Sequence, residues 1–333
     1  MNLIELKKDY LKKKINKANY IKKIYHKYHD LLFQYSNLIS KTDIQKIEIT
    51  NTSVKMTSKK FGVKMFLPKQ DHRSAPLECI NFDNYEENEL EVIMRLLPRK
   101  GNFIDIGANI GWHSLIIAKN FKQVKVYAFE PIKKTYEFLK QNIKLNTIKN
   151  INTFNFGFFN KNKKILFYTY KEGSGNSSLR NLSNRKSVIR QTAHVKIFDH
   201  FIKKKKLKVD FIKCDVEGAE LFVFLGAKKV LLKDKPIVFC EMLRKWCKKF
   251  KYHPNEIILL FKKYGYECFK ITNFIEKKIL NLKNKKNVKR IKMNLNSKKF
   301  KLKKIKRINN STKETNFLFI HKVKNSKIIK QYI

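Results

Sequence analysis

Acidic residues stand at four points of the sequence where a short apolar run ends. Asp105 falls in DIGANIG, Glu130 in FEP, Asp215 and Glu217 in CDVEGAE, and Glu241 in CEM. Carboxylates in such positions can accept hydrogen bonds from ribose hydroxyls, remove a proton from a substrate or hold a divalent cation. The four points therefore predict one catalytic or ligand-binding edge, provided that the fold brings them together.

Small residues follow the first acid, in the segment GANIG at 107–111. A turn of this composition lets a ligand approach backbone N–H groups at a helix start. Its spacing differs from the G-x-G-x-x-G of pyrophosphate-binding turns, and it lacks the Lys-Ser/Thr pair of a P-loop, so a nucleoside without phosphates fits better. Glu130, 25 residues after Asp105, is placed to accept ribose hydroxyls. Together the two motifs predict a site for S-adenosylmethionine, with a purely structural turn as the alternative.

These motifs lie in a series of alternating strand-like and helix-like segments. Apolar runs predict strands at 102–106, 124–129, 151–156, 193–198, 209–214, 236–240, 267–271 and 316–322. Periodic segments predict helices at 85–97, from 112, and at 133–146, 217–232 and 254–264. Repeated strand-helix units favour an α/β fold with a doubly wound, mostly parallel sheet covered by helices on both faces. Ligands bind beyond the carboxyl ends of such strands, which is where the acids are expected.

The first 80 residues are expected to extend a catalytic domain at 81–325. Apolar residues recur in steps of three and four between residues 21 and 38, which predicts a basic amphipathic helix within residues 1–45, and a short strand follows at 61–67. Such a helix can lie on a membrane or bind a partner, but packing on its own domain is the favoured interpretation. A Lys-rich insert at about 277–313 is the second addition. Its residues 277–307 hold 15 basic residues and no acidic one, so most of it is interpreted as a mobile loop.

The chain carries 75 Lys and Arg residues against 27 Asp and Glu, a formal net charge of +48. Disorder of the whole chain is excluded, because 43% of the residues are hydrophobic and 13% are aromatic. An anionic partner at the Lys-rich insert is one explanation of the charge. However, 66 of the 75 basic residues are Lys, which is read from A/T-rich codons, and Arg is scarce. Compositional drift is therefore the favoured explanation, and nucleic acid is disfavoured as a partner.

Cysteine usage and hydropathy address the compartment. The five cysteines include no C-x-x-C pair, which favours neither a disulfide framework nor a zinc site. The longest apolar runs fall far short of the ~18 residues that a transmembrane helix needs. We therefore expect a cytoplasmic protein without a transmembrane segment.

Five segments together resemble one known family. FIDIGANIGWHSL, YAFEP, DFIKCDVEGAELFVFLGA, PIVFCEM and the terminal NFLFIHK are similar to the FkbM family of S-adenosylmethionine-dependent methyltransferases, over about residues 85–322. The resemblance implies the class I methyltransferase fold, a Rossmann-like sheet of seven strands whose last strand is antiparallel. It also implies O-methylation of a hydroxyl on a sugar or natural product. The cofactor contacts that follow are Asp105, Gly107, Ala108, Asn109, Gly111, Glu130, Pro131 and Asn160, the last in a Phe-Asn pair where the family often has Gly-Asp.

Methyl transfer from a sulfonium donor is an in-line displacement, so the protein mainly positions donor and acceptor, although a hydroxyl acceptor must also lose its proton. Asp215 is the first candidate for the base or orienting group, followed by Glu217 and then His113. Asp215 and Glu241, expected on neighbouring strands, are also candidate ligands for Mg²⁺. We expect an O-methyltransferase acting on a glycan or another small molecule. An RNA ribose 2′-O-methyltransferase and a catalytically inactive binding module are the alternatives.

Overall fold

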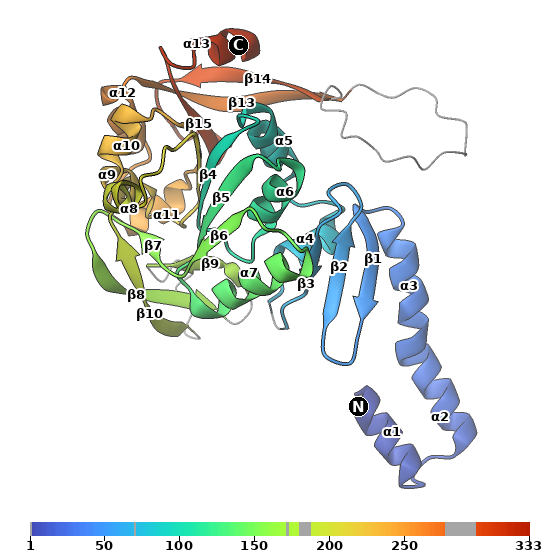
Figure 1. The fold of residues 1–333 in the computed structure, drawn as a ribbon. Helices are drawn as coiled ribbons and strands as arrows, with labels where there is room; N and C mark the ends of the chain where they lie inside the picture. Colours follow the sequence, from blue (N-terminus) through green and yellow to red (C-terminus); the bar gives the residue numbers. More distant parts are fainter. Residues whose placement is uncertain (1, 70, 171–172, 180–187, 277–297) are drawn as a thin grey trace. The chain divides into compact units, whose positions relative to one another are not determined.

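The computed structural model describes residues 2–69, 71–170, 173–179, 188–276 and 298–333 (Figure 1). The chain divides into two compact units, the first comprising Met1–Leu67 with Pro76–Tyr85 and the second Pro68–Ala75 with Glu86–Ile333. Among the described residues, no helix combines the length and the apolar character that crossing a membrane requires. All the candidate site residues belong to the second unit.

The first unit consists of a helical segment and a small antiparallel sheet. The residues predicted as one amphipathic helix form α1 (Leu3–Leu11), α2 (Lys17–Ile24), the π-helix η1 (Tyr25–His29) and α3 (Asp30–Ile39). The side chain of Asn16 caps α2, so a new helix starts after the turn that follows α1. Helix α3 has no buried residue, and the predicted packing of this region on its own domain stays a prediction.

The sheet of the first unit is larger than predicted. It contains β1 (Ile44–Ile49), β2 (Val54–Ser58) and β3 (Lys64–Phe66), of which the sequence predicts only the last, and α4 (Ala75–Phe82) follows it. Half of the residues of strand β1 are solvent-exposed, and the strand lacks the continuous apolar run that marks a strand in the sequence.

The second unit is built on an eight-stranded sheet in the order β14-β13-β15-β12-β11-β4-β5-β6. The strands are β4 (Gly101–Ile106), β5 (Val124–Phe129), β6 (Ile151–Phe154), β11 (Phe211–Cys214), β12 (Ile237–Glu241), β13 (Tyr266–Glu276), β14 (Lys298–Ile305) and β15 (Asn316–His321). Strands β6, β5, β4, β11 and β12 run parallel, whereas β15 is antiparallel to both neighbours. This arrangement confirms the doubly wound, Rossmann-like sheet with an antiparallel last strand that a class I methyltransferase fold requires.

Strand β14 is an addition to the seven expected strands. It pairs antiparallel with β13 and falls in the Lys-rich insert, so the interpretation as a mobile loop is wrong for residues 298–305, whereas residues 277–297 lie outside the described residues. Phe300 and Leu302 are buried on one side of the strand, and Lys301 and Lys303 are exposed on the other. The period of two is present in the sequence, but the dense lysines conceal it.

Helices cover both faces of the large sheet (Figure 1). One face carries α5 (Glu87–Leu96), α6 (Trp112–Asn120) and α7 (Lys133–Leu145). The other carries α8 (Phe198–Lys205), α9 (Glu220–Leu225), α10 (Lys228–Lys233), α11 (Arg244–Lys249) and α12 (Asn255–Lys263), and α13 (Ser326–Tyr332) ends the chain. Ile104, Ile212 and Val238 share a core with α8 to α12. Because both faces are buried, the central strands are mostly apolar, which makes them easy to find in the sequence.

A second, four-stranded sheet occupies the less regular stretch between β6 and β11. Its strands, in the order β7-β10-β8-β9, are β7 (Gly157–Phe158), β8 (Lys163–Tyr170), β9 (Gly173–Ser178) and β10 (Ile189–Lys196). Ile132, Phe167, Ala193 and Val195 form its small core. Strand β9 ends at Ser178, whose hydroxyl contacts the candidate site.

Candidate active site

In the turn after β4, every backbone N–H of residues 107–111 donates to an acceptor within the chain. Gly107 and Ala108 donate to the Phe129 carbonyl (3.0 Å each), Asn109 to Glu130 Oε2 (3.0 Å), Ile110 to Asn109 Oδ1 (2.8 Å) and Gly111 to the Ala108 carbonyl (2.9 Å). A pyrophosphate would need such N–H groups as its own donors. The turn therefore suits a ligand without phosphates, in agreement with its spacing.

Gly107 also brings this turn against the neighbouring strand. Its φ is +80°, and a Cβ at this position would lie 1.8 Å from the Asp215 carbonyl oxygen. Only glycine accommodates both the left-handed backbone and this close approach. The ends of β4 and β11 are thereby in direct contact.

Glu130, directly after β5, is buried and holds the turn in place. Its Oε2 accepts the Asn109 N–H, and its Oε1 accepts the Ile132 N–H (2.9 Å). Burial raises the pKa of Glu130 to about 7, although the two hydrogen bonds oppose the rise. Each carboxylate oxygen retains a second lone pair, so the group can fix the turn and still accept a ribose hydroxyl.

Two asparagines follow the next strand. Asn155 Nδ2 donates to the carbonyls of Glu130 (2.9 Å) and Pro131 (3.1 Å) and so fixes the segment that follows β5. Asn155 is not among the residues predicted from the sequence, and its position directly after β6 is the only signal that could have indicated it. Asn160 Oδ1 is buried and has no hydrogen-bond partner among the described residues. An orphaned buried acceptor fits a ligand that brings its own donor, such as an exocyclic amino group.

A buried lysine joins the ends of β4 and β11. Lys213 lies opposite Asp105 in the strand pairing, and its Nζ is 3.8 Å from Asp105 Oδ1, 3.1 Å from Asp215 Oδ2 and 3.4 Å from the Gly107 carbonyl oxygen. Burial favours the neutral amine, but the carboxylates of Asp215 and Asp105 outweigh it and raise the pKa of Lys213. The sequence analysis did not assign Lys213 a role, although a lysine inside the apolar strand FIKC is a recognisable signal.

Asp105 is completely buried beneath the turn. Its Oδ2 accepts a hydrogen bond from the Ser114 hydroxyl (2.6 Å), and its other oxygen faces Lys213. Burial raises the pKa of Asp105, while Lys213 and Ser114 oppose the rise. The structure thus places Asp105 as a support of the turn, with its charge directed at Lys213.

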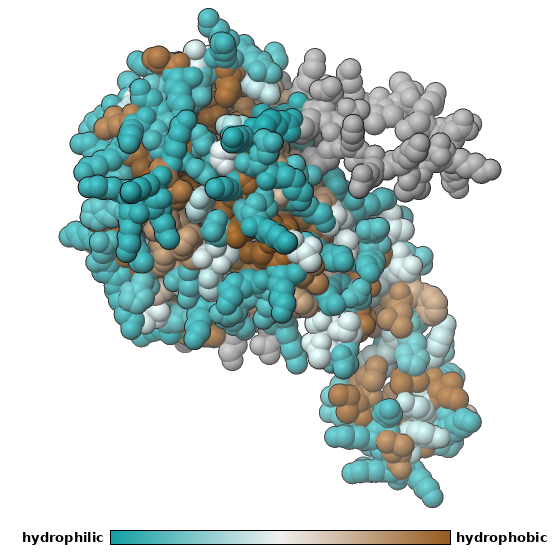
Figure 2. All heavy atoms as spheres, in the orientation of Figure 1, coloured by the Kyte–Doolittle hydropathy of each residue, from teal (hydrophilic) through white to brown (hydrophobic). Residues whose placement is uncertain are grey.

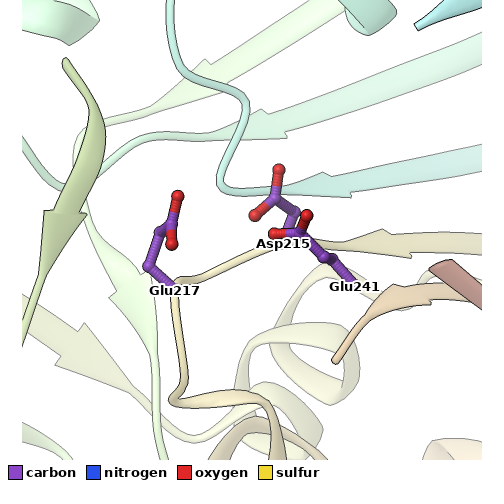
Figure 3. A group of neighbouring side chains, drawn as sticks. All are labelled: Asp215, Glu217 and Glu241. Atoms are coloured by element: carbon purple, nitrogen blue, oxygen red, sulfur yellow. The ribbon is translucent and has the colours of Figure 1, made fainter. Parts of the chain in front are cut away.

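Three carboxylates meet at the ends of β11 and β12. The pairing of Cys214 with Cys240 sets Asp215 beside Glu241, and oxygen atoms of Asp215, Glu217 and Glu241 all lie within 4.8 Å of one another (Figure 3). Burial, followed by the negative charge of Asp215, raises the pKa of both Glu217 and Glu241 well above the usual value. A bound proton or cation would reduce this repulsion. The expected convergence of Asp215 and Glu241 is thus observed, and Glu217 joins them.

The turn that carries Glu217 is held in an unusual backbone conformation. Glu217 has a φ of +55°, and its carbonyl accepts the Ser178 hydroxyl (2.8 Å). Glu220 Oε1 accepts the N–H groups of Val216 (3.2 Å) and Gly218 (3.0 Å), and its Oε2 accepts the Tyr252 hydroxyl (3.2 Å). Glu220 therefore stabilises the turn. Glu217 Oε2, in contrast, is buried without a hydrogen-bond partner among the described residues.

His113 is placed apart from these three acids. It is buried at the start of α6, and its Nε2 lies 3.3 Å from Glu86 Oε2. Burial, followed by the charge of Lys213, lowers the pKa of His113 well below the usual value, which favours the neutral imidazole. The structure thus brings together two of the three predicted catalytic residues, Asp215 and Glu217, and pairs the third with Glu86.

The sequence around this site matches a known family model. Residues 105–268 match the model described as the methyltransferase FkbM domain, and this stretch includes every candidate cofactor and catalytic residue. Two curated relatives are each 26% identical: "Methyltransferase 1" of Beauveria bassiana over 147 residues, and "Methyltransferase sdnD" of Sordaria araneosa over 159 residues. Each match covers 39% of this chain, which spans only about 60% of the relatives' own length (59% and 61%).

Solved structures give more distant matches. A methyltransferase FkbM from Methylobacillus flagellatus is 17% identical, with 53% of this chain and 41% of that chain covered and a TM-score of 0.36. The TYW2 protein of M. jannaschii in complex with AdoMet is 14% identical, with 69% of this chain and 82% of that chain covered and a TM-score of 0.30.

Proposed function

The chain carries a methyltransferase FkbM domain at residues 105–268, and from this premise we propose that it is an S-adenosylmethionine-dependent O-methyltransferase that methylates a hydroxyl of a glycan or another small molecule. The observation that carries the proposal is the contact between two preformed parts of the sheet edge. Lys213 Nζ donates both to the Gly107 carbonyl, in the turn proposed for the donor, and to Asp215, in the acid group proposed for the acceptor. Donor and acceptor sites would then adjoin, as an in-line transfer needs.

The described residues fit S-adenosylmethionine. Glu130 would accept the ribose hydroxyls, and the orphaned Asn160 Oδ1 would accept the adenine amino group. Gly107, Ala108, Asn109, Gly111 and Pro131 would line the donor through their backbone and small side chains. Asp105 is buried beneath the turn, so we propose that it positions the donor site through Lys213 and Ser114. The bound donor would supply the electrophilic methyl group.

The acid group, which consists of Asp215, Glu217 and Glu241, would remove the proton from the acceptor. The sequence ranks Asp215 first, but Lys213 Nζ lies 3.1 Å from Asp215 Oδ2, so this carboxylate already has a cationic partner. Glu217 has a raised pKa and an oxygen without a partner among the described residues. A base works best when its pKa lies near the working pH. We therefore propose Glu217 as the base and Asp215 as the group that orients the acceptor hydroxyl.

Magnesium binding is a second candidate role for the same acids. Carboxylate oxygens are the ligands that Mg²⁺ prefers, and Asp215, Glu217 and Glu241 are close enough to share one ion. A cation would relieve the repulsion that raises the pKa values of Glu217 and Glu241. Bound Mg²⁺ would lower the pKa of an acceptor hydroxyl. Glu241, which has no assigned part in proton removal, separates the two roles.

The two alternatives raised by the sequence, an RNA ribose 2′-O-methyltransferase and an inactive binding module, are less well supported than this proposal. Three acids at the acceptor side disfavour a polyanionic substrate, so RNA ribose 2′-O-methylation is second to a small-molecule hydroxyl. An inactive binding module would not require the unpartnered Glu217 oxygen or the orphaned Asn160 oxygen. The Lys-rich insert as an anionic docking site stays a proposal, and most of it lies outside the described residues.

Calorimetric titration and turnover test the proposal. We expect the protein to bind S-adenosylmethionine and S-adenosylhomocysteine, and to transfer labelled methyl groups into the neutral glycan or small-molecule fraction of a cell extract. The variant Asp215→Asn should keep donor binding and lose most of the methyl-transfer activity. The absence of donor binding would overturn the cofactor assignment. Label found only in RNA would overturn the acceptor class and favour the ribose alternative.

A further inference from the structure

The helical segment at residues 3–39, comprising α1, α2, η1 and α3, leaves most of its apolar side chains uncovered. Leu6 and Ile24 are its only buried apolar residues, and the rings of Tyr10 and Tyr20 stack at 4.6 Å between α1 and α2. The large apolar side chains that remain exposed are Leu3, Ile4, Leu11, Ile21, Tyr25, Leu31, Leu32, Phe33, Tyr35 and Leu38. Figure 2 shows hydrophobic atoms interspersed with hydrophilic ones over this segment.

Helix α3 is the most extreme part of this segment. It has no buried residue, and Leu32 and Phe33 are 55% and 61% exposed. Single exposed apolar residues are common, but ten within 37 residues is a density that indicates an interaction surface. Such a surface favours an occupant that can accept apolar side chains.

The charge of this segment indicates what kind of partner covers its apolar side chains. Residues 1–40 hold nine lysines against three acids: Lys7, Lys8, Lys12, Lys13, Lys14, Lys17, Lys22, Lys23 and Lys27 against Glu5, Asp9 and Asp30. A second copy of the chain would bring two such basic segments together, and their like charges would oppose the contact. A surface that is apolar beneath and anionic above complements both properties. Lysine-rich helices with exposed Leu, Phe and Tyr lie at the interface of anionic bilayers for this reason.

We propose that this helical segment binds the surface of a bilayer that contains anionic phospholipids. The apolar side chains of α3, led by Leu32 and Phe33, enter the boundary between headgroups and acyl chains, while the lysines of α1 and α2 contact the phosphates. Tyr25 and Tyr35 suit the headgroup level, because their rings are apolar and their hydroxyls polar. The segment would thereby hold the enzyme at a membrane surface. The inference is independent of the methyl-transfer proposal, since it uses residues of the first unit alone.

Vesicle co-sedimentation of the full chain tests the proposal. The probes are vesicles of phosphatidylglycerol and phosphatidylcholine in equal parts, and vesicles of phosphatidylcholine alone. We expect binding to the first that is at least about tenfold tighter than to the second, because each lysine near an anionic surface adds attraction. The double variant Leu32→Gln/Phe33→Gln should weaken binding to the anionic vesicles at least about tenfold, since two large side chains no longer leave water.

Matched variants in the second unit control for the overall charge of +48. Leu259 and Val323 are 55% and 70% exposed, so Leu259→Gln/Val323→Gln removes comparable apolar surface and should change binding less than about twofold. Lys22→Ser/Lys23→Ser should weaken binding several-fold, whereas Lys262→Ser/Lys263→Ser should not. Helix content measured by circular dichroism checks that the variants keep α3 folded.

Three outcomes would overturn the proposal. The first is a wild-type chain that does not sediment with anionic vesicles. The second is equal binding by the wild type and the Leu32→Gln/Phe33→Gln variant, which would mean that general charge attraction explains the sedimentation. The third is light scattering that shows a dimer which this variant converts to a monomer without loss of vesicle binding, which would assign the surface to a second copy.

Discussion

Around the turn at residues 107–111, each backbone N–H has an acceptor within the chain, whereas around Asp215 three carboxylates crowd together and a buried oxygen of Glu217 has no partner among the described residues. The backbone N–H groups of the first region are satisfied without a ligand, so under the proposed function this region supplies mainly shape. The second region holds like charges close together, and under the proposed function it supplies the reacting groups. Substitutions in the first region should therefore affect donor binding, and substitutions in the second should affect turnover. Lys213 contacts both regions, so its substitution should affect both donor binding and turnover.

The largest effect is expected for Lys213→Met. The substitution leaves Asp105 buried without its counter-ion, and removing one partner of a buried ion pair costs about 3–5 kcal/mol. Urea unfolding should show this loss together with loss of donor binding. The matched control is Lys208→Met, because Lys208 is largely exposed and 3.9 Å from Asp210, and its loss should cost less than about 0.5 kcal/mol. Equal stability of the two variants would refute the role of Lys213 as the link between the regions.

The second prediction isolates the acid region. Glu217→Gln keeps the shape of the side chain but cannot take a proton, so kcat should fall at least about a hundredfold while donor affinity changes less than about twofold. Glu220→Gln is the matched control on the same turn. Because Glu220 accepts hydrogen bonds from two backbone N–H groups, the main effect of this variant should be a loss of stability and not of kcat. A Glu217→Gln variant with wild-type kcat would return the role of base to Asp215.

The third prediction isolates the donor region. Glu130→Gln retains one acceptor oxygen but loses the charge, and we expect affinity for S-adenosylhomocysteine to fall about tenfold by calorimetry. In Glu130→Ala the affinity for S-adenosylhomocysteine should fall further. The melting temperature should also fall, because the N–H groups of Asn109 and Ile132 lose their acceptor. If both variants bind as tightly as the wild type, Glu130 is a structural residue alone.

The fourth prediction is a pH profile. Activity that depends on deprotonated Glu217 should rise with pH through a raised pKa, so its acidic limb should lie above the range of an ordinary glutamate. Asp215 contributes to that rise, and Asp215→Asn removes a negative charge. The limb measured on the residual activity should therefore move to lower pH. A limb that stays in place would show that another group titrates.

The contrast between the two regions also explains what the sequence could predict. Strands β4 and β5 are buried on both faces, so their apolar runs mark them to within one residue, and with them the places of Asp105 and Glu130. The meeting of Asp215 and Glu241 follows from the strand order alone. The sequence does not predict which of the acids acts as the base. That choice depends on the pairing of Lys213 with Asp105 and on the left-handed backbone at Glu217, and neither of these two features has a local sequence signal.

Predictions fail where solvent covers one side of an element. Strand β14 is concealed by the lysines on its exposed side, and β1 lacks a continuous apolar run. The spacing of apolar residues at 21–38 correctly indicates a helix but says nothing about what covers it. In α3 those side chains remain exposed. The spacing of apolar residues identifies one face of a helix, but it does not identify what packs against that face.

The smallest expected effect decides between a base and a metal site in the acid region. If Asp215, Glu217 and Glu241 hold Mg²⁺, free ion at five times its dissociation constant should stabilise the folded protein by about 1 kcal/mol, and calcium should compete for the same carboxylates. Glu241→Gln should abolish this shift in melting temperature and reduce turnover. If the acids act through Glu217 alone, Mg²⁺ should leave the melting temperature unchanged and Glu241→Gln should stabilise the protein at neutral pH, because it removes one of the buried like charges. The two outcomes differ in whether Mg²⁺ shifts the melting temperature of the wild type, so thermal melts with and without Mg²⁺ separate them even before an acceptor is known.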